Sequence, residues 1–303
     1  MKYTFSVSDE QNQDRIDKCI SAYYEDLSRS YVQRLIEEGA VLCNDSPCKS
    51  NKKVSSGDRI TIDVPESVIP PIEPEDIPLD ILYEDEDVIV VNKPKGMVVH
   101  PAAGHYSGTM VNALLYHCKD LSGINGVLRP GIVHRIDMDT TGSVIACKND
   151  AAHKEIAKQL KEHSINRNYL ALVHGNIEEE SGTVHAPIGR SERDRKKMAV
   201  NVRNGKDAIT HYQVVERFQG YTLIDCKLET GRTHQIRVHM ASIHHPVVGD
   251  KVYCTQKPPC KLEGQALHAY LLGFKHPKTG EYIEIKAPMP SYFTEFLSTL
   301  KSF

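Results

Sequence analysis

The nine residues His134–Gly142, which read HRIDMDTTG, place an arginine, two aspartates and a turn side by side. The residues ahead of them, 127–133 (VLRPGIV), predict a loop that becomes a short apolar strand, and Ser143–Cys147 (SVIAC) predicts a second strand. Arg135 and Asp137 would then be held in a tight connection between two core strands. Because buried charges are costly unless they are paired, the sequence indicates a functional site here rather than a solvated surface turn.

Length and composition indicate a globular protein with two domains. The chain has 303 residues, of which 40% are hydrophobic, and this length is enough for two cores. No apolar run reaches the roughly 18 residues that a membrane helix needs. The first six residues, MKYTFS, lack the apolar stretch of a signal peptide. We therefore expect a cytoplasmic protein that does not bind membranes and acts as a monomer.

The eight cysteines are expected to be reduced thiols. The closest pairs are Cys43 with Cys48 and Cys254 with Cys260, and no Cys-x-x-Cys motif occurs. The histidines likewise form no helical His-x-x-x-His pair beside an acid. The sequence therefore predicts neither a metal site nor a cofactor.

Charge is distributed unevenly along the chain. The formal net charge is -3, and residues 1–64 hold 9 Lys and Arg against 11 Asp and Glu. Residues 65–90 hold 9 acids and no Lys or Arg, whereas residues 91–303 hold 28 Lys and Arg against 20 acids. The long C-terminal part is thus basic, which favours a polyanionic partner.

The N-terminal segment predicts a compact module of helices and short strands. Apolar spacing predicts helices over residues 14–24 and 29–38, with Ser28 as the N-cap of the second. Asn44 and Asp45 predict a hairpin turn, and residues 59–63 predict a strand. Two helices followed by short strands make a unit of about 60 residues.

One face of the second predicted helix carries Arg29, Gln33 and Arg34. Taken alone, this face is typical of a solvated helix surface. Over residues from about 12 to 63, however, the module resembles the S-four RNA-binding domain. The matching segments are RID (15–17), SRSYVQRLI (28–36), GAV (39–41), Asn44 and GDRI (57–60). The resemblance implies an RNA-binding domain over residues 1–64, with Arg29, Gln33 and Arg34 as RNA contacts.

Residues 65–82 contain five prolines separated by acids, which predicts an extended linker. Residues 83–303 then form the second domain. Strands are predicted over residues 87–92, 168–174, 211–218 and 221–228, and a helix over residues 151–162. This order predicts an α+β domain with a mixed, largely antiparallel sheet flanked by helices. Residues 189–198 (GRSERDRKKM) have the positive charge expected of a phosphate-contacting loop, although a solvated charged loop is the alternative.

Asp137, Tyr169 and Arg237 belong to groups of polar residues that recur in this domain, and each taken alone has an ordinary structural explanation. An aspartate beside Thr140, Thr141 and Gly142 often shapes a turn, a tyrosine in a strand often belongs to a core, and an arginine often forms a structural ion pair. Taken together, the motifs resemble the pseudouridine synthases of the RluA/RluD family over nearly the full chain. The matching segments are KPKGMVVHP (93–101), HRIDMDTTG (134–142), RNYLALVHG (167–175), PIGR (187–190), TGRTHQIRVH (230–239) and QALHA (265–269).

The resemblance implies that the chain isomerises uridine in RNA to pseudouridine without a cofactor. The family's catalytic aspartate falls on Asp137, which must be ionised to act as a nucleophile or as a base. The arginine that pairs with it falls on Arg237, and the tyrosine that stacks on the base falls on Tyr169. Arg135 falls on the arginine that occupies the space of the extruded base. Further phosphate contacts are expected from Arg190, Arg195, Lys196 and Lys197.

Large-subunit ribosomal RNA is the substrate that this domain order favours, and transfer RNA stays open. A non-catalytic RNA-binding factor for ribosome assembly is the alternative function, supported by the N-terminal module alone. A metal-dependent hydrolase built on the histidines is a third interpretation, and it predicts bound metal.

Overall fold

The computed structural model describes residues 2–24, 27–64, 72–102, 105–124, 126, 129–194, 197–256, 262 and 264–302. The chain divides into two compact units, Met1–Pro70 and Pro71–Phe303. No helix within the described ranges is long and apolar enough to cross a membrane.

The first unit is a four-stranded antiparallel sheet packed against two helices. Its sheet has the strand order β1-β4-β2-β3. The Tyr31 amide donates to Ser28 Oγ at 3.3 Å, so the predicted N-cap is formed. Asn44 and Asp45 both have positive φ, as a tight hairpin requires. The elements are β1 (Lys2–Ser6), a 3₁₀ turn (Asp9–Gln11), α1 (Ile16–Tyr23), α2 (Arg29–Glu37), β2 (Val41–Cys43), β3 (Ser46–Pro47) and β4 (Arg59–Asp63).

The predicted linker over residues 65–82 is described from residue 72 onwards. Residues 65–71 lie outside the described part of the chain, and residues 72–80 have no regular secondary structure. Ile77 and Leu79 nevertheless pack on the core of the second unit, and Asn112 Nδ2 donates to the Glu73 carbonyl at 2.8 Å. Apolar residues between the prolines therefore bind this extended segment to the second unit.

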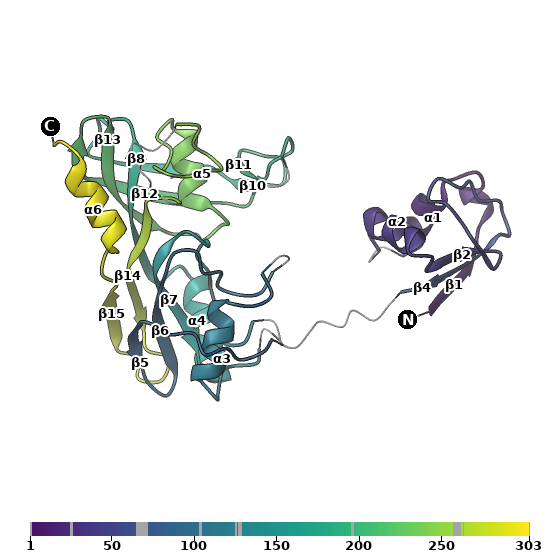
Figure 1. Cartoon of the computed structure of the whole chain (residues 1–303), viewed down its shortest axis with the longest axis horizontal. Helices are drawn as coiled ribbons and strands as arrows, with labels where there is room; N and C mark the ends of the chain where they lie inside the picture. The colour runs from purple at the N-terminus through teal and green to yellow at the C-terminus, as the bar shows by residue number, and fades with distance from the viewer. Residues whose placement is uncertain are drawn as a thin grey trace. The chain divides into compact units, whose positions relative to one another are not determined.

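A nine-stranded mixed sheet forms the frame of the second unit (Figure 1). Its order is β5-β6-β7-β14-β8-β13-β12-β9, with β15 also paired to β14. Only the β7–β14 pair is parallel among these strands, which confirms the predicted mixed, largely antiparallel sheet. The strands are β5 (Ile81–Glu84), β6 (Val88–Lys93), β7 (Thr141–Cys147), β8 (Asn166–His174), β9 (Ser181–His185), β12 (Ile209–Phe218), β13 (Tyr221–Leu228), β14 (Leu267–Lys275) and β15 (Tyr282–Lys286). A separate hairpin is formed by β10 (Ile188–Arg190) and β11 (Met198–Val200).

Helices cover both faces of this sheet. The helices α3 (Met110–His117) and α5 (Gln235–Ser242) contribute to the largest core cluster. The helix α4 (Asp150–Lys161) and the helix α6 (Ser291–Thr299) belong to two other clusters. Figure 1 shows α5 and α6 on opposite sides of the sheet. Of these four helices the sequence predicted α4.

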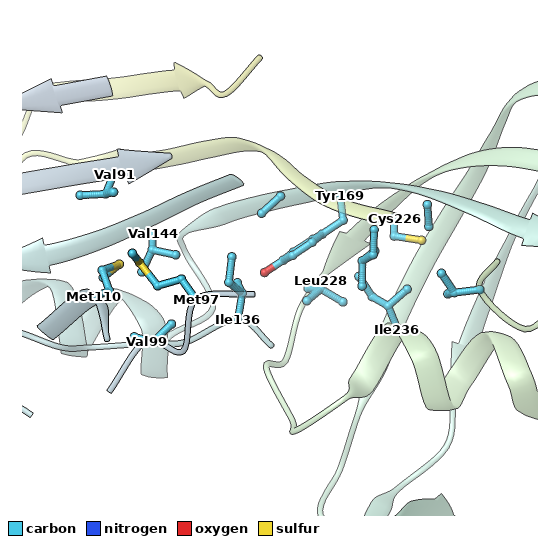
Figure 2. Packing of buried hydrophobic residues seen from close by; sticks show 14 of the residues in the cluster. Val91, Met97, Val99, Met110, Ile136, Val144, Tyr169, Cys226, Leu228 and Ile236 are labelled. Carbon is cyan, nitrogen blue, oxygen red and sulfur yellow. The ribbon is translucent and has the colours of Figure 1, made fainter. Parts of the chain in front are cut away.

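The largest core runs along one face of the sheet and reaches the HRIDMDTTG segment. Figure 2 shows its residues in a continuous row from Val91 through Ile136 and Tyr169 to Ile236. Ile136 is buried in this cluster although its neighbours in sequence are polar. The core therefore anchors the segment through Ile136, whereas Arg135 beside it is exposed and Asp137 is half-buried.

The strand predicted just ahead of HRIDMDTTG does not form in the described residues 129–133. Ile132 makes a single isolated bridge to Ala146, and the Cys147 amide donates to the Gly131 carbonyl at 2.8 Å. The segment thus crosses β7 at one point and runs on as a loop. The motif is consequently a loop that enters one strand, not a connection between two strands.

Gly142 allows β7 and β14 to approach closely. The two strands pair in parallel at Thr141 with His268 and at Gly142 with Ala269. Gly142 has a φ of 109°, and a Cβ atom there would lie 2.2 Å from the Ala269 carbonyl oxygen. Only glycine fits both the backbone conformation and the space.

We predict that Gly142→Ala lowers the free energy of unfolding by about 3 kcal/mol, because the methyl group adds overlap to an unfavourable φ. Urea unfolding of the full chain measures the change. Gly280→Ala is the matched control, since its φ of 74° is also positive but no atom lies within 4 Å of the added Cβ. The control should lose only about 1 kcal/mol, and equal losses in both variants would contradict the explanation.

Candidate active site

A buried lysine holds the loop that carries Asp137. Lys93, at the end of β6 and 1% exposed, donates to the carbonyls of Pro94, Met97 and Met138 at 2.8, 2.8 and 2.9 Å. Burial lowers the pKa of Lys93 to about 7, against the opposing charges of Asp139 and Asp137. Three acceptor carbonyls use all three N–H groups of an ammonium, so the contacts favour the charged form.

The other end of the loop is held by side chains of the segment that leads into β14. Gln265 Nε2 donates to Thr140 Oγ1 at 2.9 Å, and Thr141 Oγ1 lies 2.8 Å from His268 Nδ1. Within the loop, the Thr140 amide donates to the Asp137 carbonyl at 3.1 Å. These bonds use two threonine hydroxyls and the backbone of the loop, and they leave the Asp137 carboxylate to line a cavity.

Arg237 of α5 pairs with Asp137 across a hundred positions of sequence. Arg237 Nη1 donates to Asp137 Oδ2 at 2.8 Å, and the Arg237 residue is 5% exposed. The structure therefore brings together the two residues that the family resemblance paired. The pair links the loop that carries Asp137 to the helix α5.

Asp250, which the sequence analysis missed, fixes Arg237 from the other side. Arg237 Nε and Nη2 donate to its two carboxylate oxygens at 2.7 and 3.0 Å, and the amides of Val252 and Tyr253 donate to Asp250 Oδ1. Burial alone would raise the pKa of Asp250, but the bonds and charge of Arg237 outweigh it and hold the pKa below its ordinary value. Within its turn, Asp250 has no sequence signal that distinguishes it from an ordinary turn aspartate.

His234 stands next to the Asp137–Arg237 pair. It adopts a left-handed backbone conformation at the start of α5, and its Nε2 lies 3.8 Å from Asp137 Oδ1. Its Nδ1 lies 2.8 Å from the Tyr253 hydroxyl. Burial lowers the pKa of His234, so the ring is neutral near pH 7 and adds no second positive charge beside Asp137.

Tyr169 lies in the wall of the same cavity. It is 7% exposed, belongs to the main core, and lies near Ile136 and Leu228 in Figure 2. Burial raises the pKa of its hydroxyl, so the side chain is uncharged at neutral pH. The ring is thus a fixed apolar surface beside the Asp137 carboxylate.

The cavity has a volume of about 570 Å³ and a strongly positive lining. This volume is within the usual range of small-ligand sites. Asp137 is the one acid among the described lining residues. The lining cations are Arg129, Arg135, Lys161, Arg167, Arg232 and Arg237. The site is therefore suited to a polyanion that presents a neutral group to a single carboxylate.

Two histidines of the lining are neutral at physiological pH. Burial, helped by the charges of Arg135 and Arg129, lowers the pKa of His100 to about 4. Burial together with Arg167 lowers the pKa of His134 to about 3. In the part of the chain that the structure describes, the groups close enough to share a metal ion are Glu84 with His117 and Cys118, and Asp85 with Asp87 and His276. Neither group lines this cavity.

The predicted RNA-contacting residues of the second unit fall in two places. Arg135 is exposed and lines the cavity beside Asp137. Arg190 ends β10 and Lys197 precedes β11, so both lie on the β10–β11 hairpin and outside the cavity lining. Arg195 and Lys196 lie outside the described residues. Arg129, Lys161 and Arg232 line the cavity but were not predicted, because their positions are scattered in sequence.

In the first unit, a buried aspartate accepts hydrogen bonds from two of the three predicted RNA-contacting residues. Asp17 has a fully buried side chain and accepts from Arg29 Nε at 3.1 Å and from Gln33 Nε2 at 2.5 Å. Arg15 also donates to it, at 2.9 and 3.1 Å. Arg34, by contrast, lies 3.7 Å from Glu38. The structure thus joins Arg29 and Gln33 in one polar cluster and leaves Arg34 outside it.

Comparison with known proteins agrees with this geometry. Residues 87–242 match the family model of RNA pseudouridylate synthases, and residues 14–60 match that of the S4 domain. The chain belongs to the RNA pseudouridine synthase family. It is 52% identical to an uncharacterised RNA pseudouridine synthase of Bacillus subtilis, YlyB, over 98% of this chain and 97% of that protein.

Two further matches extend the comparison. Ribosomal large subunit pseudouridine synthase D of Zymomonas mobilis is 47% identical, over 91% of this chain and 90% of that protein. The solved structure of human RNA pseudouridylate synthase domain containing 1 is 26% identical, with a TM-score of 0.60 over 75% of this chain and 89% of that one. The predicted family, fold class and synthase activity are confirmed, and the non-catalytic assembly factor finds no support in these matches.

We predict that Asp250→Asn slows pseudouridine formation about 100-fold, because a small displacement of Arg237 misplaces Asp137. Single-turnover kinetics measures the rate, and filter binding should show RNA affinity unchanged within about twofold. Asp225→Asn is the matched control, since Asp225 is a partly buried carboxylate that accepts from Asn168 and Tyr270 outside the cavity lining. Equal rates for Asp250→Asn and the control would show that Asp250 does not position Arg237.

We also predict that Asp17→Asn destabilises the first unit by about 1–2 kcal/mol, since it removes the negative charge and one of the two acceptor oxygens that three partly solvated donors share. Their hydrogen bonds outweigh the effect of burial and hold the pKa of Asp17 below its ordinary value. The contribution is therefore present above the unfolded-state pKa of about 3.9 and lost as the pH falls towards the folded-state pKa.

Hydrogen exchange of the α1 and α2 amides measures this loss, which should shrink below about pH 4. Asp14→Asn serves as the control, because Asp14 pairs with the exposed Lys18 and should change stability by less than about 0.5 kcal/mol. A loss that stays constant down to pH 2 would exclude the charge of Asp17 as its cause.

Proposed function

We propose that this chain isomerises uridines of large-subunit ribosomal RNA to pseudouridine, with Asp137 as the reacting carboxylate. The observation that carries the proposal is the Asp137 carboxylate, which Arg237 pairs at 2.8 Å inside a cavity with a cationic lining. A cation-lined cavity attracts RNA, and its single acid is available to the ribose or base of one nucleotide.

The reaction needs an ionised carboxylate next to a nucleoside. The bond between uracil N1 and ribose C1′ breaks, the uracil turns, and a bond forms between C5 and C1′. C5 then gives up its proton and N1 holds one in the product, so atoms and charge balance without a cofactor. Asp137 acts either as a nucleophile at C1′ or as a base on the ribose. Arg237 is the ion-pair partner of this carboxylate in either case.

Tyr169 and Arg135 are assigned to handling the base. A stacked ribose carbon is out of reach, so the nucleotide must leave the helix at a cost of a few kcal/mol. The buried ring of Tyr169 offers a flat surface for the detached uracil while it turns. Arg135, which is exposed and lines the cavity, would occupy the gap that the base leaves.

The choice of substrate rests on the relatives. The Zymomonas mobilis relative is named for the large ribosomal subunit, and transfer RNA is the second candidate. Because ribosomal RNA is the proposed substrate, we expect the protein to act in the cytoplasm. We also expect it to act as a monomer, since Asp137, Tyr169 and Arg237 all come from one chain.

RNA contacts outside the cavity are assigned to both units. In the first unit they are Arg29, Gln33 and Arg34, with Asp17 orienting the first two. In the second they are Arg190 and Lys197 of the β10–β11 hairpin, together with Arg195 and Lys196. Removing one phosphate contact should reduce the slope of log K for RNA binding against log salt concentration by about one.

The test is pseudouridine mapping by carbodiimide-dependent reverse-transcription stops in cells with and without this protein. We expect stops in large-subunit ribosomal RNA that disappear on deletion and return with the wild-type chain. Asp137→Asn should restore none and should lose at least about 1000-fold in rate, with RNA binding kept. Stops confined to transfer RNA would overturn the substrate, and normal turnover by Asp137→Asn would overturn the assignment of the carboxylate.

A further inference from the structure

Three cationic side chains are buried in the described part of the chain, namely Lys93, Arg167 and Arg237. Lys93 donates to three carbonyls, and Arg237 bonds two carboxylates. Arg167 differs from both. It is 8% exposed, and no described carboxylate lies within ion-pair distance of it.

The guanidinium of Arg167 has few partners of any kind. Arg167 Nη2 donates to the Glu229 carbonyl at a long 3.4 Å, and its buried Nε has no hydrogen-bond partner. Arginine keeps its charge in proteins, so this cation is largely buried with one long hydrogen bond and no paired carboxylate. Such a charge lowers the stability of the fold, which makes it difficult to explain as a structural element.

Arg167 lines the cavity that contains Asp137 and Tyr169. It lies two residues before Tyr169 on β8, and residues two apart on a strand share a face. Gly231 leaves room for its head group, because a Cβ there would lie 2.6 Å from Arg167 Nη1. The guanidinium is therefore accommodated at the cavity by a position that has no side chain.

A second donor without a partner lines the same cavity. His134 Nε2 accepts from the Ile145 amide at 3.1 Å, so in the neutral ring the proton is on Nδ1. That Nδ1 is buried and has no partner. Burial and the nearby charge of Arg167 lower the pKa of His134 to about 3, which keeps the ring neutral. Two residues of the cavity lining, one of them cationic, thus each carry a buried nitrogen donor without a partner.

We propose that Arg167 binds a phosphate group of the extruded uridine nucleotide, with His134 Nδ1 as a further donor. The inference rests on the proposed function, because uracil and ribose are uncharged and the phosphates supply the negative charge of the nucleotide. Phosphate entry would pair the buried guanidinium and offset part of the cost of unstacking the base. A phosphate bound at Arg167 would position the ribose of any nucleotide relative to Asp137, whatever its base.

The first test is binding of uridine, uridine 5′-monophosphate and uridine 3′-monophosphate to the full chain, followed by NMR titration. We expect one of the two nucleotides to bind about 10–100-fold more tightly than uridine. Arg167→Met should abolish this advantage, and Arg167→Lys should keep part of it. Lys161→Gln, which removes an exposed cation of the same lining, should reduce it only slightly because of screening.

Two outcomes of the titration would overturn the proposal. One is an equal affinity of the wild type for all three ligands. The other is an equal loss of uridine and nucleotide binding in Arg167→Met, which would place the base or ribose on Arg167. Because the titration needs no turnover, it gives an answer even if the wild type forms no pseudouridine, a result that would contradict only the proposed function.

Urea unfolding separates a binding role from a structural one. An uncompensated buried cation destabilises the free protein, so we expect Arg167→Met to unfold at the same or a higher urea concentration than the wild type. A clearly lower midpoint would show that Arg167 is part of the fold and would overturn the proposal. With RNA containing the mapped uridine, Arg167→Met should raise the half-saturating RNA concentration about 10-fold or more.

Discussion

The site depends on one guanidinium held between two carboxylates. Arg237 bonds Asp250 through two nitrogens and Asp137 through the third. Asp250 is itself held by two backbone amides. The backbone therefore fixes Asp250, Asp250 fixes Arg237, and Arg237 fixes the Asp137 carboxylate. A desolvated ion pair is stable only with such additional bonds, and here they also fix where the Asp137 carboxylate lies.

The buried cations of the second unit illustrate two uses of desolvated charge. Lys93 and Arg237 are fully compensated and organise the loop and the carboxylate. Arg167 is buried in the same region without an acid. Functional sites often keep a locally unfavourable arrangement that a ligand relieves, and a cavity lined by cations around one carboxylate fits an anionic ligand.

Local sequence patterns correctly predicted three helices that have one apolar face. The helices α1, α2 and α4 have clear amphipathic spacing and were predicted to within about two residues. The helix α5 was missed because residues on all its sides are buried, from Gln235 to Met240, so it shows no single stripe. The strand predicted before HRIDMDTTG did not form because apolar composition alone does not provide a partner strand.

The sequence by itself determined the family, the two kinds of unit and the identity of the candidate residues, because these depend on local motifs. Tertiary structure decided which charges meet. Asp250 and Arg167 look ordinary in the sequence, since the first stands in a turn and the second begins a strand. Their environments depend on segments that folding brings together from residues 134, 167, 231 and 250. Burial and pairing are properties of that assembly, and a linear pattern does not contain them.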